Sequence, residues 1–196
     1  MTRIMTFEEL RGQIANCLEC PSLVASRRRV VPGYGDVQAK TMFIGLCPGR
    51  NGADLTGIPF TRDRSGQIFQ GVMRELGFLV GKRFENAYVT NIVKCCPRDR
   101  FGRNRTPTQD EIACCRKYLQ VEIDLIRPNF IITLGRAATE CVLERRIARL
   151  SDVSFNPIRR QYATVIPSYH PSYVTRGAYP RERYFSEFGK LATLIC

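Results

Sequence analysis

The chain has 196 residues, 44% of them hydrophobic, so it is long enough for a single domain, residues 1–196, with a well-filled core. It carries 30 Lys and Arg but 18 Asp and Glu, and a formal net charge of +12 favours a polyanionic partner such as nucleic acid. There is neither the apolar segment of a secretion signal nor a run of about 18 apolar residues. We therefore expect a cytoplasmic, nucleoid-associated protein of a prokaryote.

Capping signals and apolar periodicity predict helices that alternate with short strands. Thr6 and Thr108 each begin a Ser/Thr-x-x-Glu capping box, which predicts the start of a helix. Gly77 and Pro128 are stop signals for two of the predicted helices. In chain order we predict a helix from Thr6 to about Cys17, a strand at 41–47, a helix from Ser65 to about Gly77, a strand at 87–94, a helix from Thr108 to about Arg127, a strand at 130–135, a helix from Arg136 to about Leu150, a strand at 162–169 and a helix from about Arg181 onward.

This order of elements predicts an α/β fold. Strands separated by helices form βαβ units, so we expect a three-layer α/β/α sandwich around a central, mainly parallel, four-stranded sheet. Ligands of such sheets bind beyond the carboxyl ends of the strands. Four polar segments are predicted to meet there: the glycine-rich loop after Ile44, residues Asn91–Cys96, Gly135 with Arg136, and Ser168–His170.

The loop from Gly45 to Gly66 is rich in glycine, which lets the main chain approach a ligand closely. It matches neither the phosphate loop that ends in Gly-Lys-Ser/Thr nor the dinucleotide-binding GxGxxG pattern. Its amides and the ring of Phe60 suit a planar base, although the same ring equally fits the core. Asp63 is a catalytic carboxylate, the N-cap of the next helix, or a solvated partner of Arg62 and Arg64.

His170 is the only histidine of the chain. A single histidine usually lies on the surface or in a satisfied core position, but one at the carboxyl end of a strand is a better catalytic candidate. Basic residues gather in segments predicted as loops, above all at 98–105, where they would contact the phosphates of a nucleic acid.

Nine cysteines are many for a reducing compartment, in which structural disulfides are rare. Three close pairs stand out: Cys17 with Cys20, Cys95 with Cys96, and Cys114 with Cys115. These segments can supply the four thiolates of a structural zinc site or an iron–sulfur cluster, and both remain open; otherwise the cysteines are small buried hydrophobes. We interpret the remaining three, Cys47, Cys141 and Cys196, as packing residues.

Motifs along nearly the whole chain resemble the uracil-DNA glycosylase superfamily, specifically its iron–sulfur members, families four and five. They are CLECPSLVASRRRVVPGYGD at 17–36, GLCPG at 45–49, GIPFTRDRSG at 57–66, TNIVKCCP at 90–97, NRTPTQDEIACC at 104–115, TLG at 133–135 and YHPS at 169–172. The resemblance implies a DNA repair glycosylase that flips out a deaminated base, chiefly uracil, and hydrolyses its N-glycosidic bond to leave an abasic site. It implies a monomer and leaves a contact with a sliding clamp unassigned.

The resemblance also implies roles for single residues. Asp63 and His170 are the catalytic pair: the carboxylate steadies the sugar cation or orients water, and the imidazole donates a hydrogen bond to the base. The substrate-binding set is Gly45, Leu46, Cys47, Gly49, Phe60, Asn91 and Asn104. The DNA-binding set is Arg103, Arg105, Ser172, Tyr173 and Arg176. From their position in the loop alone, we expect Tyr173 and Val174 to fill the hole left by the flipped base.

The family pattern implies a structural [4Fe-4S] cluster. It places the ligands at Cys17, Cys20, Cys95 and Cys115, with Cys96 and Cys114 as close competitors. Such a cluster would order the arginine-rich loop that lies between its last two ligands in the sequence.

Within the family the sequence is mixed. Leu46 stands where family four has the glutamate of its GEAPG motif, whereas Asp63 and Asn104 match the catalytic aspartate and the Asn-Arg/Lys-x-Pro asparagine of family five. Asn91 is instead the base-reading asparagine of family four, and Thr175 replaces an asparagine of family five. We favour family five because the carboxylate decides the chemistry.

Two alternatives are a glycosylase that prefers hypoxanthine or xanthine, and a non-catalytic nucleic-acid-binding protein stabilised by a cluster or zinc.

Overall fold

The computed structural model describes residues 5–195, so the interpretation of Cys196 lies outside the described residues. The helices are α1 (Phe7–Ala15), α2 (Pro21–Ser26), α3 (Ala53–Thr56), α4 (Arg64–Glu75), α5 (Gln109–Ile126), α6 (Arg136–Leu143), α7 (Ser172–Thr175) and α8 (Arg181–Ile195), with a 3-10 turn at Leu150–Asp152. The strands are β1 (Tyr34–Gly35), β2 (Thr41–Gly45), β3 (Leu79–Val80), β4 (Arg83–Phe84), β5 (Ala87–Asn91), β6 (Phe130–Leu134), β7 (Ile158–Arg159) and β8 (Thr164–Ser168). None of the helices in this range combines the length and apolar character needed to cross a bilayer.

The main sheet has six strands in the order β1-β5-β2-β6-β8-β7. Its four central strands are parallel, since β2 pairs with β5 and β6, and β6 pairs with β8. The mainly parallel sheet is therefore confirmed, but its predicted four strands become six, because β1 and β7 add antiparallel edges. Each edge strand has two residues, which is too few to produce an alternating pattern in the sequence.

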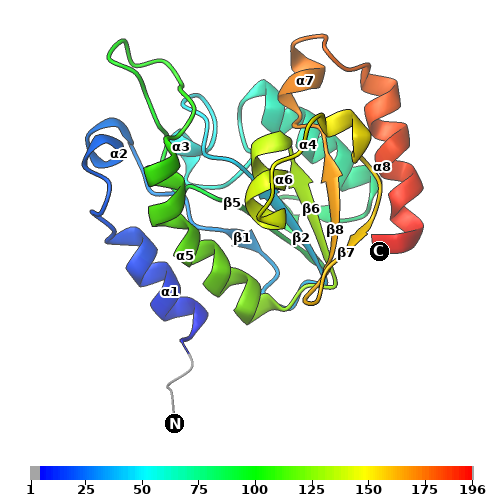
Figure 1. The fold of residues 1–196 in the computed structure, drawn as a ribbon, viewed down its shortest axis with the longest axis horizontal. Helices are drawn as coiled ribbons and strands as arrows, with labels where there is room; N and C mark the ends of the chain where they lie inside the picture. Colours follow the sequence, from blue (N-terminus) through cyan, green and yellow to red (C-terminus); the bar gives the residue numbers. More distant parts are fainter. Residues whose placement is uncertain (1–4, 196) are drawn as a thin grey trace.

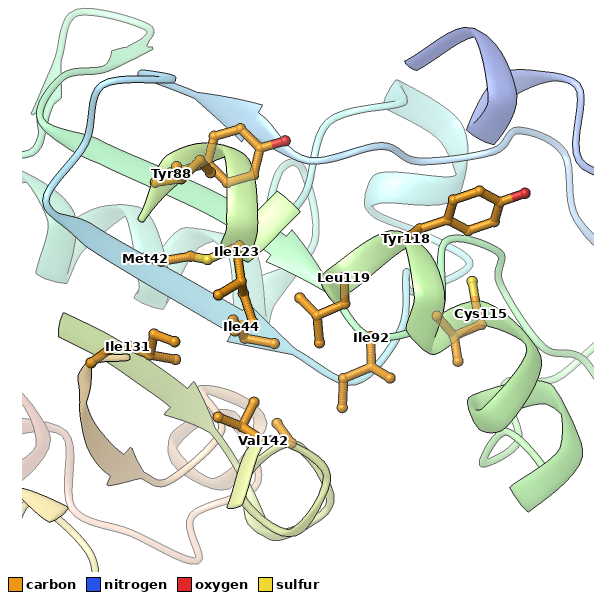
Figure 2. Packing of buried hydrophobic residues seen from close by; sticks show 14 of the residues in the cluster. Met42, Ile44, Tyr88, Ile92, Cys115, Tyr118, Leu119, Ile123, Ile131 and Val142 are labelled. Carbon is orange, nitrogen blue, oxygen red and sulfur yellow. The ribbon is translucent and has the colours of Figure 1, made fainter. Parts of the chain in front are cut away.

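Helices cover both faces of the sheet and complete the three layers (Figure 1). Side chains alternate along β2, so Met42 and Ile44 enter a core with α1, α5 and α6, whereas Phe43 enters a second core with Phe69 of α4 and Tyr184 of α8. Figure 2 shows the first of these cores, in which β2 faces apolar residues of α5. Both faces of the sheet are thus buried, and its carboxyl edge carries the loops.

The predicted helix starts agree with the caps of the structure. Thr6 and Thr108 both form complete capping boxes. Helix α4 begins at Arg64, one residue before the predicted Ser65, because Asp63 is its N-cap. The first residue after its C-cap is Gly77, which takes the left-handed φ of 74° expected of a stop signal.

The predicted helix from Arg136 to about Leu150 is wrong in its second half, because α6 ends at Leu143. Glu144 takes a left-handed φ of 55°, and the Glu140 carboxylate accepts the backbone N–H of Ile147 at 3.0 Å. This bond from side chain to backbone replaces the helical hydrogen bond and turns the chain so that Ile147 is buried.

Candidate active site and cysteine cluster

The carboxyl ends of the parallel strands hold a cavity of about 350 Å³. It lies among the loop after β2, the long loop between β5 and α5, and the segment of α7, which stand along the upper edge of the sheet in Figure 1. Its volume is within the range of small-molecule sites. The predicted residues that line it are Leu46, Cys47, Gly49, Phe60, Asp63, Asn91, Asn104, Arg105, His170, Ser172 and Arg176.

Asp63 is both a helix cap and a carboxylate of the pocket wall. Its Oδ1 accepts the backbone N–H of Gly66 at 2.8 Å, as an N-cap does. Its Oδ2 lies against the glycine loop, because a Cβ at Gly49 or Gly52 would stand 2.9 or 2.4 Å from it. Within residues 5–195 no ion pair joins Asp63 to a flanking arginine, so the solvated-pair interpretation fails. The glycines are therefore needed for the approach of the carboxylate.

His170 is a neutral hydrogen-bond donor. The backbone N–H of Ser172 donates to its Nδ1 at 3.1 Å, and the Ser172 hydroxyl lies 2.9 Å from the same nitrogen. Because a backbone N–H can only donate, Nδ1 is the acceptor and the neutral ring carries its hydrogen on Nε2. Burial, and next the positive charge of Arg176, lowers the pKa of His170 to about 4. The ring is thus uncharged at neutral pH.

Phe60 belongs to the core and to the pocket at the same time. Its ring centroid lies 4.5 Å from that of Phe69 and 5.7 Å from that of His170, and it is 9% exposed. A Cβ at Gly45 would stand 2.4 Å from Asn91 Oδ1 and 2.7 Å from Phe60 Cζ. Gly45 does not itself line the cavity; its missing side chain makes room for Asn91 and Phe60.

The predicted DNA-binding arginines of the long loop differ in their surroundings. Arg105 lines the pocket and forms a two-point ion pair with Glu111 at 2.6 and 2.7 Å, which lowers the Glu111 pKa to about 2. Its charge is therefore already engaged at the start of α5. Arg103 lies outside the pocket and its side chain is 68% exposed. Asn104, between them, accepts the backbone N–H of Arg50 from the glycine loop at 3.1 Å.

Helix α7 places a ring and a cation beside the pocket. Tyr173 is 37% exposed and lies outside the lining, and the guanidinium of Arg176 stands 5.1 Å from its ring centroid. Val174 is partly buried against the second core instead. Of the two residues predicted to fill the hole left by a flipped base, only Tyr173 is exposed.

The cysteines of three distant segments gather beside α1, α2 and α5. Cys95 and Cys115 are buried in the first core, and Cys17 and Cys20 pack half-buried against it. Cys95 lies within electrostatic range of Cys17 and Cys20, and Cys115 within range of Cys95 and Cys17. The side chain of Arg27 donates to Cys95 Sγ at 3.1 Å. N–H donors to sulfur favour thiolates, so this donor set fits a bound cluster.

The neighbouring cysteines have other partners. Cys96 Sγ lies 3.6 Å from Asn104 Oδ1 and interacts with Arg98 on the pocket side. Cys114 Sγ donates to Glu19 Oε2 at 3.1 Å and lies beside Cys20. Cys96 thus lies on the pocket side, whereas Cys114 stays beside the predicted ligand Cys20.

No three His, Cys, Asp or Glu side chains within residues 5–195 come close enough to bind one metal ion. A mononuclear zinc site draws its four ligands to about 2.0 to 2.3 Å from one atom. A four-iron cluster is larger and is held by thiolates that stand farther apart. Either group would draw on the thiolates that gather around the first core, those of Cys17, Cys20, Cys95 and Cys115.

The sequence reasoning missed a buried ion pair behind the pocket. Lys94, whose side chain is 1% exposed, donates to Glu122 Oε2 and Thr90 Oγ1 at 2.7 Å and to the Asn91 carbonyl at 2.6 Å. Glu122 also accepts the Tyr88 hydroxyl at 3.2 Å. Only a glutamate on the buried face of α5 signals this network in the sequence. Because Lys94 holds the Asn91 carbonyl, the network fixes the backbone of Asn91, whose side chain lines the pocket.

A second carboxylate outside the predicted set joins two arginine-rich segments. Asp54 of α3 is fully buried; its Oδ1 accepts the backbone N–H of Arg28 at 2.9 Å and its Oδ2 pairs with Arg98. It thereby holds the run at 27–29 and the base of the loop at 98–105 beside the same edge of the sheet.

The chain is similar to known proteins along most of its length. A family model described as "Uracil DNA glycosylase superfamily" matches residues 32–190. The type-4 uracil-DNA glycosylase of Thermotoga maritima is 35% identical over 89% of this chain and 86% of its own length, and that of Archaeoglobus fulgidus is 32% identical over 96% and 93%. A type-5 uracil-DNA glycosylase of Pyrobaculum aerophilum is 30% identical over 85% and 82%. Relatives of both iron–sulfur types thus match at similar identity.

Proposed function

This chain belongs to the uracil-DNA glycosylase superfamily, and we propose that it excises uracil from DNA by hydrolysing the bond between the base and its deoxyribose. The observation that carries the proposal is the shared cavity of Asp63 and His170. A carboxylate and a neutral hydrogen-bond donor on one pocket are the pair that this hydrolysis requires.

The base reaches this pocket by leaving the helix, because its glycosidic bond is shielded inside stacked DNA. Phe60 offers a ring face on which the flipped base stacks. Asn91 and the backbone amides of Leu46, Cys47 and Gly49, which line the cavity, bind its polar edge. Phe60 and His170 form one wall of the pocket. This wall excludes water from the stacked base and so strengthens the hydrogen bonds to the polar edge of the base.

Bond cleavage separates charge within the pocket. Positive charge develops on the sugar and negative charge on the departing base. The Asp63 carboxylate stabilises the sugar cation and orients the attacking water, while Nε2–H of His170 donates toward the base oxygen. Both groups are held before the substrate arrives, Asp63 by the N-terminus of α4 and His170 by Ser172. Charges and hydrogen-bond donors that are fixed in advance are usually the largest source of such catalysis.

Cys17, Cys20, Cys95 and Cys115 would hold a [4Fe-4S] cluster, whose contribution is to cross-link three segments of the chain. The loop that would contact DNA phosphates begins directly after one ligand and ends in the helix that carries another. The cluster therefore acts on the position of the loop, and no catalytic step passes through it.

Within the family we favour the type-5 group. Asp63 matches the catalytic aspartate of that group, and Leu46 stands where type 4 has a glutamate. Asn91 remains a type-4 feature, so we expect a pocket that reads uracil well and accepts hypoxanthine less well.

The test is excision from synthetic DNA. Oligonucleotides with one uracil, single-stranded and opposite each base, are incubated with the protein and then broken at abasic sites by alkali. We expect cleavage at uracil and none at thymine in the same position. Binding without cleavage at uracil or hypoxanthine would instead indicate a non-catalytic DNA-binding protein.

The identity of the cofactor has an independent readout. A protein purified without oxygen should be brown, absorb visible light through iron–sulfur charge transfer, and contain about four irons per chain. Zinc in place of iron in elemental analysis would contradict the cluster assignment.

A further inference from the structure

Phe101 is an exposed aromatic residue in the loop between β5 and α5. Its side chain is 64% exposed, and the chemistry proposed above does not use it. The loop projects from the same edge of the sheet as the pocket (Figure 1). We propose that Phe101 stacks on a nucleobase of the bound DNA next to the flipped nucleotide. This inference rests on the proposed function and adds a second contact to the base-binding pocket.

The tip of the loop is held rigid before any ligand binds. Asp99 Oδ1 accepts the backbone N–H groups of Phe101 and Arg103, both at 2.9 Å, and its Oδ2 accepts Arg103 Nε at 3.0 Å. Gly102 completes the turn with a left-handed φ of 71°. Because the backbone on either side of the ring is fixed, stacking costs little further conformational entropy.

The tip is also tied to the pocket wall. Arg50, in the glycine loop, donates from Nη1 to the Gly102 carbonyl at 2.8 Å and from its backbone to Asn104 Oδ1 at 3.1 Å. Asn104 lines the pocket. These two bonds join the backbone of the tip to the glycine loop and so hold the tip next to the pocket wall.

The charges around Phe101 favour a nucleic acid as its partner. The guanidinium groups of Arg100 and Arg103 lie 4.7 and 5.0 Å from its ring centroid. Cations next to an aromatic ring are the combination with which proteins bind the phosphates and bases of an exposed DNA strand. The chain as a whole has a net charge of +12. A protein-binding patch would present further apolar residues in place of these two cations.

The experiment compares Phe101→Ala with Phe101→Trp in fluorescence anisotropy with a single-stranded, uracil-free oligonucleotide over a series of salt concentrations. We expect Phe101→Ala to bind about 10-fold more weakly, which is within the range of losses for one stacked base, and Phe101→Trp to bind like the parent. Since the charges are unchanged, the slope of log affinity against log salt should stay the same. Arg103→Gln should lower that slope instead.

Tyr162 offers a matched control. It is a 48% exposed aromatic residue that follows Arg159 and Arg160, in the turn between β7 and β8 at the opposite edge of the sheet (Figure 1). Tyr162→Ala should leave the affinity unchanged. An equal loss in Tyr162→Ala and Phe101→Ala, or a loss that Phe101→Trp does not restore, would overturn the proposal.

A second arm uses uracil oligonucleotides shortened one nucleotide at a time from either end. The loss in kcat/KM caused by Phe101→Ala should disappear when the stacked base is removed. If the parent excises uracil while Phe101→Ala matches it in affinity and at every length, the stacking inference fails and the proposed function stands. If the parent excises nothing, the proposed function fails, and the anisotropy arm still decides whether Phe101 binds a base.

Discussion

The pocket and the Lys94–Glu122 network are neighbours at the end of β5, where both involve Asn91. Their polar groups differ in whether protein atoms satisfy them. In the network, all three ammonium hydrogens of Lys94 bind protein oxygens, and both side chains are at most 1% exposed. In the pocket, Asp63 and His170 border a cavity of about 350 Å³. The polar groups of the network bind one another and fix the geometry, whereas Asp63 and His170 are each held through one polar atom and keep the other, Oδ2 or Nε2, for a ligand.

Asn91 connects the two regions. Its backbone carbonyl is an acceptor in the network, and its side chain lines the pocket. The comparison predicts that changes in the network act first on stability, whereas changes in the pocket act first on the rate of excision.

The largest effect on stability is expected for Lys94→Met. The change leaves Glu122 buried without its counter-charge, which should lower the free energy of unfolding by about 3–5 kcal/mol in urea titration. Lys190→Met is the control, because Lys190 pairs with Glu187 on the surface, where an ion pair contributes about 0–1 kcal/mol. Similar losses in the two variants would mean that the buried network is not a stabilising unit.

The largest effect on rate is expected for the pocket pair. His170→Ala and Asp63→Ala should each slow single-turnover excision of uracil by about 100- to 1,000-fold while DNA binding in anisotropy is retained. Asp63→Asn is the matched variant, because asparagine keeps the N-cap of α4 and removes only the charge. If Asp63→Asn is as active as the parent, the carboxylate acts through the helix cap and not on the sugar.

A smaller effect is expected when the carboxylate is displaced but kept. The Cβ of Gly49→Ala would stand 2.9 Å from Asp63 Oδ2, with no other atom closer than 3.9 Å. We expect kcat to fall about 10- to 100-fold because a catalytic group is misplaced. Gly12→Ala in α1, where an added Cβ meets nothing within 4 Å, should leave kcat unchanged. An unchanged kcat in Gly49→Ala would show that the position of Oδ2 is not critical.

The smallest effect concerns pH. Because the folded pKa of His170 is about 4, excision should show no inflection near pH 6.5, the ordinary value for histidine. The unfolded chain binds a proton more readily than the folded one between these values, so stability should fall as the pH is lowered from about 6.5 toward 4. NMR of the single imidazole checks the titration directly, and a midpoint near 6.5 would contradict a ring held neutral by burial.

Local signals in the sequence determined the helix starts, the order of elements and the position of the pocket. Thr6, Thr108 and Gly77 act within a few residues of themselves, so their effect is readable from the chain. The glycine loop and His170 fall at strand ends, and parallel strands bring their carboxyl ends to one edge whatever the details of packing. Both catalytic candidates were therefore predictable as one site.

The tertiary structure alone decided which polar side chains meet. Lys94 and Glu122 are 28 residues apart. Ser22, whose hydroxyl donates to Glu111 Oε1 at 2.7 Å, is 89 residues from its partner. No local pattern encodes such pairs. Whether Cys95 or Cys96 is the cluster ligand depends on the direction in which each of these adjacent side chains points. The second role of Asp63, with one oxygen on a helix and the other among glycines, likewise arises only when the loop folds back on α4. The physical reason is that side-chain direction follows from packing between distant segments, which sequence spacing does not specify.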